Sequence, residues 1–348
     1  MTTPEPPPAA LRLDIDRDAL AGNWRTLDAM SGGAVAGAAV KANGYGLGVP
    51  AVVPVLRDAG CGNFFVAHWS EVAAVAEHVP TGAISVLHGP LTTADAAYAK
   101  AMGVKPVINS PIQARLWLEA GGGACDLMVD TGINRLGLPM AEVGDEAIGQ
   151  LEVDVLMSHL ASADEDVPLN ELQWTRFEDV KRAVPHRRSS LANSAGIALG
   201  SAYHNDLTRP GLALYGGIQR CEFSSTIRQV ARPMAAILQV RNVQAGDSLG
   251  YNATFTASGP MRVGTIALGY ADGYLRCWSS KGAMLSQGRR LPVLGRVSMD
   301  MTIIDLSTAP DLKDGDWVEA EYAPVEAATA SGLSQYELFT LLGQRFGR

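Results

Sequence analysis

Lys41 is the residue in this sequence best placed to do chemistry. It directly follows the apolar run AGAAV and precedes the glycine-rich turn ANGYGLG. A lysine at the end of a buried strand is partly removed from water, which lowers its pKa, and the neutral amine can then form an imine with an aldehyde or ketone. The alternative is a lysine that extends from a strand end into solvent without a chemical role. Position alone favours this second interpretation, so the surrounding residues must decide.

A second group of small and polar residues suits a phosphate. Asn193 and Ser194 lie in LANSAG, where a helix is expected to begin, and Gly211 and Leu212 lie in RPGLALYG. Backbone N–H groups in such turns and at a helix N-terminus favour an anion. These segments predict a phosphate-bearing ligand, and ordinary turns of glycine and serine are the alternative.

Three histidines, His68, His88 and His159, each follow a different apolar run. A catalytic metal usually needs a close pair of histidines or additional carboxylates. Here each histidine stands alone on its own expected strand, so we expect no metal site, and His68 and His88 are interpreted as hydrogen-bonded residues at the rim of the fold. The motifs of serine hydrolases, Walker A loops and zinc proteases do not occur.

Eight short apolar runs position these residues. The runs are GAVAGAAVK, GNFFVAH, ISVLH, KPVIN, DLMVDTG, DVLMSH, SSLANS and LTRPGLALYG. Most steps between them suit one strand, one loop and one helix, which is typical of a parallel (β/α)8 barrel, the TIM-like fold. An open doubly wound sheet would alternate in the same way, but its G-x-G-x-x-G fingerprint is absent. In a barrel the catalytic side chains project from the C-terminal ends of the strands, where Lys41 and His159 are expected to lie.

The pattern changes near residue 225. Beyond it, the strand-like runs MAAILQVRNV, MRVGTIALGY, RRLPVLGRV, MTIIDL and DWVEAEY follow one another through short turns. We therefore expect a flexible proline-rich lead over 1–10, a barrel over 11–225 that begins with the strand LRLDI, and a mostly β domain over 226–348. The pattern Ser334-x-x-Glu337 predicts a short final helix.

Composition excludes several classes of partner. The 348 residues carry 28 Lys and Arg against 36 Asp and Glu, a net charge of −8, and no basic run that would suit a nucleic acid. No apolar stretch is long enough to span a membrane, and the N-terminal sequence lacks a signal-peptide pattern. The four cysteines lie far apart without a C-x-x-C pair, which argues against zinc and against a disulfide framework. A reducing cytoplasm fits best.

The segment AVKANGYGLG resembles the cofactor-lysine motif of the alanine racemase family, whose members combine a barrel with a β domain and use pyridoxal 5'-phosphate. Further blocks resemble that family in its order: DTGINRLG, SHLASADE, NSAG, RPGLALYG, GYNATFTA, LGYADGY, GRVSMD and QYE. Together they span nearly the whole chain beyond the lead.

The resemblance assigns roles to individual residues. It implies that Lys41 carries the cofactor as an imine and that Tyr251 is the second catalytic base. The cofactor-binding residues that it implies are Lys41, Tyr45, Arg135, His159, Asn193, Ser194, Arg209, Gly211, Leu212 and Tyr336. The substrate-binding residues that it implies are Arg135, Tyr270, Met299 and Asp300. It also implies a homodimer with shared active sites, in which Tyr251 and Met299 of one subunit serve Lys41 of the other.

Racemisation explains why these residue types are needed. A proton leaves one face of the substrate and returns to the other, so two bases must flank the α-carbon while the cofactor withdraws electrons. The free phenol of a tyrosine has a pKa of ~10, so Tyr251 needs positive charge or hydrogen bonds, which a chain through His159 to Arg209 would supply. Arg209 has no acceptor, so the pyridine nitrogen to which it donates stays unprotonated, and this disfavours transamination.

Three positions depart from the family pattern. Many members have a lysine, modified to a carbamate, just before the V-D-T-G run, and this sequence has Met128 there. Methionine cannot carry a carbamate, so we expect another fixed acceptor to hold Arg135. Leu47 stands where a histidine is common, and Ser298 where a cysteine is frequent.

The leading hypothesis is therefore an alanine racemase that interconverts L- and D-alanine and supplies D-alanine for peptidoglycan. A related racemase of broader specificity is one alternative, and a barrel-type pyridoxal phosphate decarboxylase is another, against which Tyr251 argues. A cofactor-carrying regulatory protein without turnover is disfavoured by the second domain. A cofactor-free Schiff-base aldolase would be excluded by a yellow purified protein.

Overall fold

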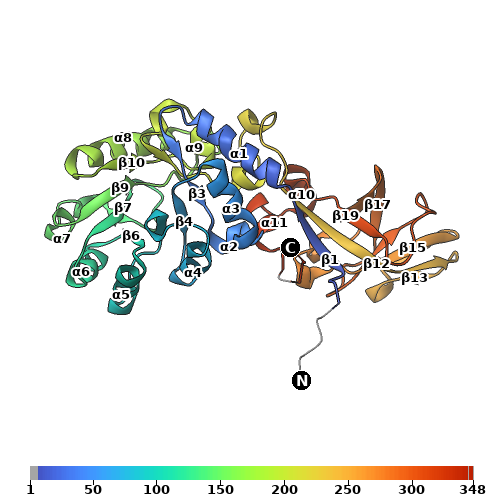
Figure 1. Cartoon of the computed structure of the whole chain (residues 1–348). Helices are drawn as coiled ribbons and strands as arrows, with labels where there is room; N and C mark the ends of the chain where they lie inside the picture. Colours follow the sequence, from blue (N-terminus) through green and yellow to red (C-terminus); the bar gives the residue numbers. More distant parts are fainter. Residues whose placement is uncertain (1–6, 344, 348) are drawn as a thin grey trace, which may run out of the picture. The chain divides into compact units, whose positions relative to one another are not determined.

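The computed structural model describes residues 7–343 and 345–347 (Figure 1). The chain forms two compact units. One comprises Arg17–Arg228, and the other comprises the chain from Gln229 onward together with the segment before Arg17. No described helix is long and apolar enough to cross a membrane.

The first unit is a parallel (β/α)8 barrel, as the apolar runs predict. Its strands are β2 (Val35–Ala36) with β3 (Ala38–Ala39), β4 (Phe64–Val66), β5 (Ile84–Val86), β6 (Lys105–Ile108), β7 (Ala124–Asp130), β9 (Glu152–Met157), β10 (Arg188–Ser190) and β11 (Leu207–Thr208). The helices around them are α1 (Arg17–Met30), α3 (Val49–Ala59), α4 (Val72–Ala76), α5 (Thr93–Met102), α6 (Pro111–Glu119), α7 (Glu146–Gly149), α8 (Pro168–Ala183) and α9 (Ser194–Ala198). Each of the eight predicted runs coincides with a strand.

Backbone hydrogen bonds close the barrel. The strands pair in the order β10-β9-β7-β6-β5-β4-β3, and β2 and β3 are two halves of one strand separated by Gly37. Gly37 N–H donates to Thr208 O at 2.9 Å, and Arg209 N–H donates to Ala192 O at 2.8 Å. β11 therefore joins the two edges of the sheet among the described residues.

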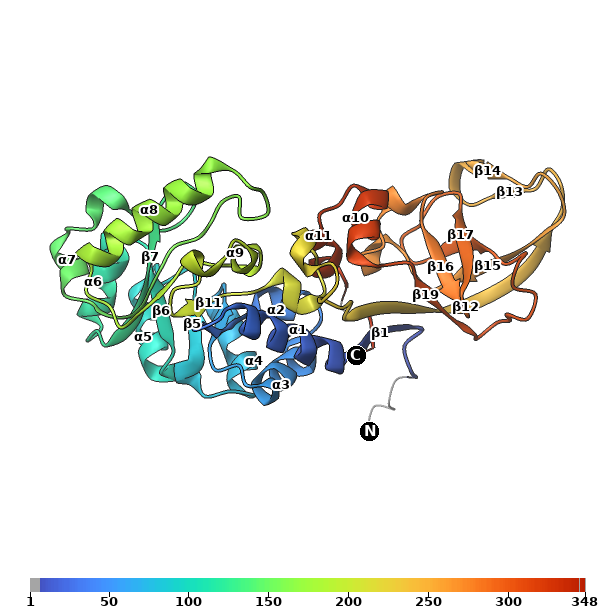
Figure 2. The ribbon, with the colours of Figure 1, turned by 90° about the horizontal axis from the view of Figure 1, so that it is seen from above.

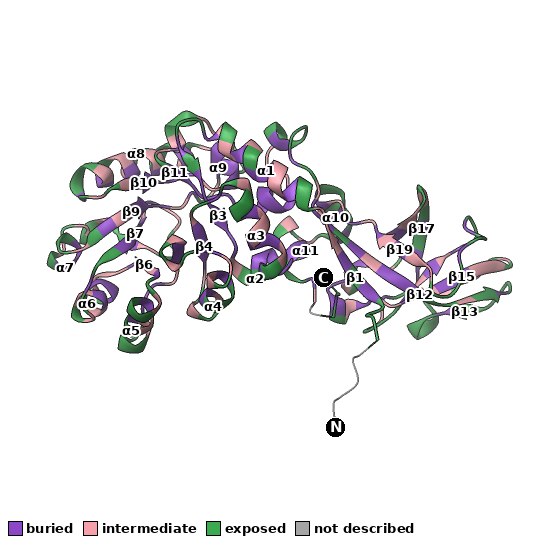
Figure 3. Cartoon of the chain, in the orientation of Figure 1, coloured by how far each residue is buried: buried purple, intermediate pink, exposed green. Residues whose placement is uncertain are grey.

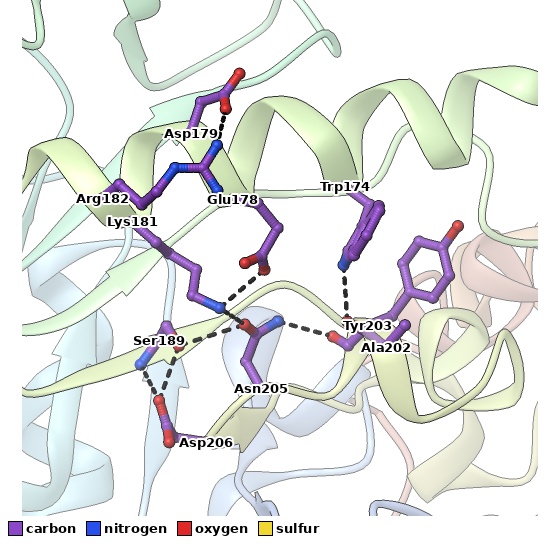
Figure 4. Close-up of polar contacts among 10 residues, drawn as sticks. All are labelled: Trp174, Glu178, Asp179, Lys181, Arg182, Ser189, Ala202, Tyr203, Asn205 and Asp206. Atoms are coloured by element: carbon purple, nitrogen blue, oxygen red, sulfur yellow. Dashed lines mark hydrogen bonds and ion pairs between the residues drawn. The ribbon is translucent and has the colours of Figure 1, made fainter.

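A polar network fixes the seam between β10 and β11 (Figure 4). The backbone N–H and hydroxyl of Ser189 both donate to the carboxylate of Asp206, at 2.7 and 2.8 Å. On α8, the Lys181 ammonium donates to Glu178 at 2.8 Å and to Asn205 Oδ1 at 2.7 Å. The helix is thereby tied to the loop that leads into β11.

Apolar side chains of the helices pack against the barrel. On α1, Leu20, Trp24 and Leu27 are buried, because their spacing places them on one helical face. Figure 3 shows that the barrel strands are largely buried while the helices expose their outer faces.

An ionic cluster lies near the N-terminal ends of the barrel strands. Lys105 Nζ lies 2.6 Å from Asp154 and 3.8 Å from Asp126, and Arg188 lies 2.9 Å from Asp154. Asp126 is fully buried, and burial raises the pKa of its carboxyl, although the Lys105 charge opposes this. Burial also acts to raise the pKa of Asp154, but hydrogen bonds from Arg188 and Lys105 outweigh it and the pKa is lowered. Lys105 is thus the cation shared by both carboxyls.

The second unit is an antiparallel β domain, as predicted. Its strands are β1 (Leu11–Ile15), β12 (Ala231–Val243), β13 (Ser248–Leu249), β14 (Phe255–Thr256), β15 (Met261–Ile266), β16 (Ala283–Ser286), β17 (Arg289–Leu294), β18 (Thr302–Asp305) and β19 (Trp317–Ala320). Seven of the described strands pair in the order β1-β12-β15-β18-β17-β16-β19, and β19 also pairs with β12, so the sheet closes on itself. β13 and β14 form a separate hairpin (Figure 2). Two helices follow, α10 (Pro324–Ser331) and α11 (Gln335–Thr340), the second with the predicted capping box at Ser334.

The first strand differs from the sequence expectation. We expected LRLDI to begin the barrel, but Leu11–Ile15 pairs antiparallel with β12, with Leu11 opposite Ala235. Leu11 and Leu13 are buried in this sheet. The alternating pattern specifies which face of a strand is buried but not which strand it joins. The chain therefore contributes one strand to the β domain before it enters the barrel.

Replacement of Lys105 by methionine should destabilise the protein by about 3 kcal/mol at neutral pH, because it leaves two carboxylates without their shared cation. Lys181→Met removes a more exposed ion pair and should cost less than about 1 kcal/mol. Burial raises the pKa of Asp126 in the folded state, so its carboxylate is protonated there at a higher pH than in the unfolded chain. The loss of stability caused by Lys105→Met should therefore shrink as the pH falls. Urea unfolding of both variants at two pH values measures this. Equal losses for the two variants would contradict the assignment.

Candidate active site

Lys41 lies immediately after β3 and begins a short left-handed turn. The segment Lys41–Tyr45 forms α2, in which Ala42, Asn43 and Gly44 have φ values of 54°, 55° and 63°. At Gly44 a Cβ atom would lie 2.6 Å from Val52 Cγ2, so the close packing of this turn also requires glycine. The glycine-rich sequence after Lys41 therefore sets the direction in which the chain leaves the strand.

The environment of Lys41 favours its neutral amine. Burial lowers the pKa of Lys41, and the positive charge of Arg135 lowers it further. The carboxylate of Glu71 acts in the opposite direction. A larger fraction of neutral amine at a given pH makes this lysine a better nucleophile and base than an exposed lysine.

His159 and Arg209 add to the electrostatics of this end of the barrel. Burial lowers the pKa of His159 to about 3, and the charges of Arg209, Arg135 and Lys41 contribute. The imidazole is therefore neutral at neutral pH. Burial also lowers the pKa of Arg209, to about 10, so the guanidinium remains charged.

Arg209 is fixed from the barrel interior. Its two terminal nitrogens donate to the Ser190 hydroxyl and to the Ser158 carbonyl, and it makes no ion pair within the described residues. The predicted chain through His159 is not formed here, since no hydrogen bond joins the His159 ring to Arg209 in the described part of the chain. Arg209 thus keeps its position without help from the histidine.

The residues predicted to hold a phosphate lie together at the ends of β10 and β11. Ser194 Oγ accepts from Gly211 N–H at 2.8 Å, and Asn193 Oδ1 caps α9 by accepting from Gly196 N–H at 2.9 Å. A Cβ atom at Gly211 would lie 2.3 Å from the Tyr45 hydroxyl, so only glycine admits the tyrosine. Leu212 follows and is buried.

Tyr45 is itself held by a second tyrosine. Its ring stacks on that of Tyr215, with centroids 4.6 Å apart and planes 22° apart. The Tyr215 hydroxyl donates to Ala39 O at 2.9 Å. The Tyr45 hydroxyl, Ser194 and Gly211 therefore form a preorganised polar cradle close to the end of β3.

Arg135 lies in a loop organised by Asp130. The Asp130 carboxylate accepts from four successive N–H groups, those of residues 132, 133, 134 and 135, at 2.9–3.1 Å. The loop then returns as β8 (Leu138–Pro139), which pairs with β7. The predicted fixed acceptor for the Arg135 guanidinium is not found among the described residues. What is fixed is the backbone that carries it.

Met128 is enclosed by apolar side chains. It packs in a cluster with Phe65, Val107, Val155, Met157 and Leu207. A carbamate at this position would be surrounded by apolar atoms, which offer it no hydrogen bonds. The apolar surroundings match the methionine and exclude a charged group.

Two of the three histidines are neighbours, contrary to expectation. His68 and His88 make an edge-to-face contact with ring centroids 4.2 Å apart, because they follow the adjacent strands β4 and β5. The pKa of His88 is lowered, first by burial and then by the charges of His68 and Lys41. Among residues 7–343 and 345–347, no group of three or more histidine, cysteine or acidic side chains is arranged to hold a metal ion.

The predicted second base lies in the β domain. Tyr251 begins a turn in which the next two residues, Asn252 and Ala253, have positive φ values of 63° and 48°, and Tyr251 is 68% exposed. It lines a cavity of about 330 Å³ together with Arg296, Ser298 and other residues of that domain. The phenol is therefore accessible rather than sequestered in this unit.

The predicted substrate residues of the β domain lie on two neighbouring loops. Tyr270 N–H donates to Ser298 O at 3.0 Å, which places Tyr270 beside the segment that carries Met299 and Asp300. Met299 is exposed, and Asp300 pairs with Arg345 at 2.7 Å. Tyr336, predicted to contact the phosphate, lies on α11 and is partly exposed.

The structure thus groups the predicted residues into two sets. The barrel carries Lys41, Tyr45, Arg135, His159, Asn193, Ser194, Arg209, Gly211 and Leu212, and the β domain carries Tyr251, Tyr270, Met299, Asp300 and Tyr336. Sequence reasoning missed Glu71, Asp130 and Tyr215, which hold the barrel residues in place. A signal existed for Glu71, because H-x-x-E resembles a capping pattern.

Two family models match the chain. The model described as the alanine racemase N-terminal domain matches residues 15–219, and that described as the alanine racemase C-terminal domain matches residues 230–348.

Curated proteins match over nearly the whole length. An alanine racemase of Methylobacterium nodulans is 42% identical, with 97% of this chain and 95% of the relative covered. A catabolic alanine racemase of Mesorhizobium japonicum is 41% identical, with 97% and 92% covered.

Solved structures share the fold. The alanine racemase of Bartonella henselae with covalently bound pyridoxal phosphate has a TM-score of 0.89 and 34% identity, covering 98% of this chain and 99% of that one. The biosynthetic alanine racemase of Pseudomonas aeruginosa has a TM-score of 0.86 and 33% identity, with the same coverage.

Because Met128 lies among apolar side chains, the activity of the native protein should not change when bicarbonate and carbon dioxide are removed. Arg135→Ala should reduce turnover ~10-fold or more, since the expected charge-assisted contact between its guanidinium and the phenolic oxygen of the cofactor would be lost. The exposed Arg187 supplies the control, and Arg187→Ala should retain activity. Steady-state assays in degassed and bicarbonate-supplemented buffers test this. A response of the native protein to bicarbonate would contradict the prediction that Met128 makes activity independent of carbon dioxide.

Proposed function

The chain belongs to the alanine racemase family, and we propose that Lys41 and Tyr251 are the two bases that exchange the α-proton of alanine. The protein is a pyridoxal phosphate-dependent amino-acid racemase that interconverts L- and D-alanine. The observation that carries the assignment of Lys41 is its lowered pKa at the end of a barrel strand, beside the polar cradle.

The residues at the barrel mouth fit pyridoxal 5'-phosphate. Gly211 leaves room for the Tyr45 hydroxyl, and the Ser194 hydroxyl lies beside it, so that polar groups suited to a phosphate lie together. Asn193 holds the helix start next to Ser194, and Leu212 presents its backbone from the following turn. In this proposal Tyr336 adds a hydroxyl to the same phosphate.

The cofactor withdraws electrons from the α-carbon when it is bound, and the chain supplies everything else. Lys41 would hold the cofactor covalently, and its amine, once the substrate amine has displaced it, would move a proton on one face of the substrate. Arg209 would hold the pyridine nitrogen with a donor that stays charged, and the neutral His159 would contact the ring. Arg135 would orient the phenolic oxygen and the substrate carboxylate through its guanidinium.

Tyr251 supplies the opposite base. A phenol acts as a base only where its anion is stabilised, and the charges at the barrel mouth suit that purpose. Tyr270, Met299 and Asp300 lie on adjoining loops of the β domain and would surround a small side chain. The proposal is that these residues favour alanine over longer amino acids.

We also propose a homodimer in which each site combines the barrel of one subunit with the Tyr251 and Met299 of the other. The exposure of Tyr251 and Met299 supports this, because an exposed side chain is available to contact a second subunit. We infer that the protein acts in the cytoplasm, which agrees with its four described cysteines being free thiols, and that it supplies D-alanine for peptidoglycan.

Incubation of the protein with L-alanine in D2O should place deuterium at the α-carbon with the carboxylate retained and with inversion to D-alanine. Borohydride reduction of the yellow holoenzyme should label Lys41. Lys41→Ala should lower turnover ~10³-fold, as loss of a positioned base does. The exposed Lys313 provides the control, since Lys313→Ala should leave turnover unchanged. Loss of the carboxylate, or a label at another lysine, would reject the assignment.

Mixing Lys41→Ala chains with Tyr251→Phe chains should restore activity, because a mixed dimer holds one intact site. With random exchange the restored activity should approach about a quarter of the native value, since half of the dimers are mixed and each has one of its two sites. The measurement is racemisation after subunit exchange, with each single variant alone as the control. Mixed dimers that form and remain inactive would refute shared sites.

A further inference from the structure

Glu71 receives hydrogen bonds from two separate segments of the barrel. One carboxylate oxygen accepts from Ala42 N–H at 2.5 Å, and the other accepts from Ala67 N–H at 2.7 Å and His68 N–H at 3.1 Å. Ala42 directly follows Lys41, whereas Ala67 and His68 follow β4. A single side chain therefore connects the turn after Lys41 to the end of the neighbouring strand.

The bond to Ala42 goes beyond a local cap. The bonds from Ala67 and His68 satisfy N–H groups at the start of the short helical turn that carries Glu71, as capping glutamates often do. The Ala42 N–H lies 29 residues earlier in the chain and has no part in that cap. The carboxylate oxygen that takes no part in the cap, Oε1, thus holds an element that the cap does not require.

The turn after Lys41 needs such support. Four successive residues, Ala42, Asn43, Gly44 and Tyr45, have φ values between 53° and 63°. Left-handed backbone is unfavourable for residues with a Cβ atom and persists only where surrounding contacts impose it. Asn43 contributes by accepting from Val49 N–H at 2.9 Å, and the Glu71 bond holds the first residue of the turn.

Charge also connects Glu71 to Lys41. The groups that act on the barrel mouth from the neighbouring loops are Arg135, His159, His88 and Glu71. Of these, Glu71 is the group that opposes the lowering of the Lys41 pKa. The Glu71 carboxylate therefore limits how far the pKa of Lys41 is lowered.

We propose that Glu71 is a positioning residue for Lys41, which fixes the left-handed turn through Ala42 and brings a negative charge close to the lysine. This inference rests on the proposed role of Lys41. One side chain thus both holds the turn by a hydrogen bond and acts on Lys41 by its charge, and substitution can separate these two effects.

Two variants make the separation. Glu71→Gln keeps the shape and one acceptor oxygen but removes the charge, and Glu71→Ala removes both. The exposed Glu77, at the end of α4, is the matched control as Glu77→Gln. Because Glu71→Gln preserves side-chain volume, the test does not depend on whether the alanine variant folds.

The first readout is amide hydrogen exchange of the peptide that spans residues 41–48 in the holoenzyme. Exchange should be ~10-fold faster or more in Glu71→Ala, because a hydrogen bond to a charged acceptor is lost, and should increase less in Glu71→Gln. The second readout is the pH dependence of Lys41 acetylation in the full-length cofactor-free chain, mapped by mass spectrometry. Its midpoint should move to lower pH in both variants and stay unchanged in Glu77→Gln.

Unchanged exchange in Glu71→Ala, or an unchanged acetylation midpoint in both Glu71 variants, would overturn the proposal. Failure of the proposed function gives a different result, namely a borohydride label at another lysine, whatever the Glu71 variants do. A structural role for Glu71 without influence on Lys41 would also leave the acetylation midpoint at the native value, and so counts against the proposal.

Discussion

Positive charge concentrated at the mouth of the barrel, where burial removes much of the surrounding water, is the constraint on which the site depends. Burial lowers the pKa of His159, and the charges of Arg209, Arg135 and Lys41 lower it further, so the imidazole is neutral. Burial and the charge of Arg135 lower the pKa of Lys41 in the same way. Such a group of cations is stable only with anions beside it. A phosphate and a phenolate are anions of the kind that this arrangement favours, which agrees with the roles proposed for these cations toward the cofactor and Tyr251.

Two carboxylates of the barrel bind the backbone near the site rather than its cations. The oxygens of Asp130 and Glu71 accept hydrogen bonds from backbone N–H groups, and each carboxylate fixes the segment that carries Arg135 or Lys41. Neither forms an ion pair with Arg135 or Lys41 within the described residues. Direct ion pairs would satisfy these cations and reduce their attraction for a ligand, so holding the backbone preserves both position and charge.

The sequence predicted the barrel because every apolar run ended at a glycine or polar turn. The strand ends indicated Lys41, His159 and the loops around Ser194 and Gly211 as site candidates, whereas the other candidates were implied by the family resemblance. What it could not predict depends on partners distant in the chain. The alternation of Leu11–Ile15 identifies a strand without identifying β12 as its neighbour. The contact between His68 and His88 follows from the adjacency of consecutive barrel strands, whereas the spacing of histidines along the chain indicates only that each follows its own strand. Residue types also cannot indicate whether the Arg135 guanidinium has a fixed acceptor, and none is found among the described residues.

The two units have complementary deficits, and this supports the proposal of a shared site. The barrel supplies an amine of lowered pKa and several cations, yet it lacks an identified base for the opposite face. The β domain supplies Tyr251, an exposed phenol on a turn with positive φ values. A phenol in water is a weak base at neutral pH, whereas one placed near buried cations loses its proton more easily. Each unit therefore offers what the other needs. The residues that follow Lys41 and Tyr251 have positive φ values, so each proposed base lies next to backbone that only a fixed environment maintains.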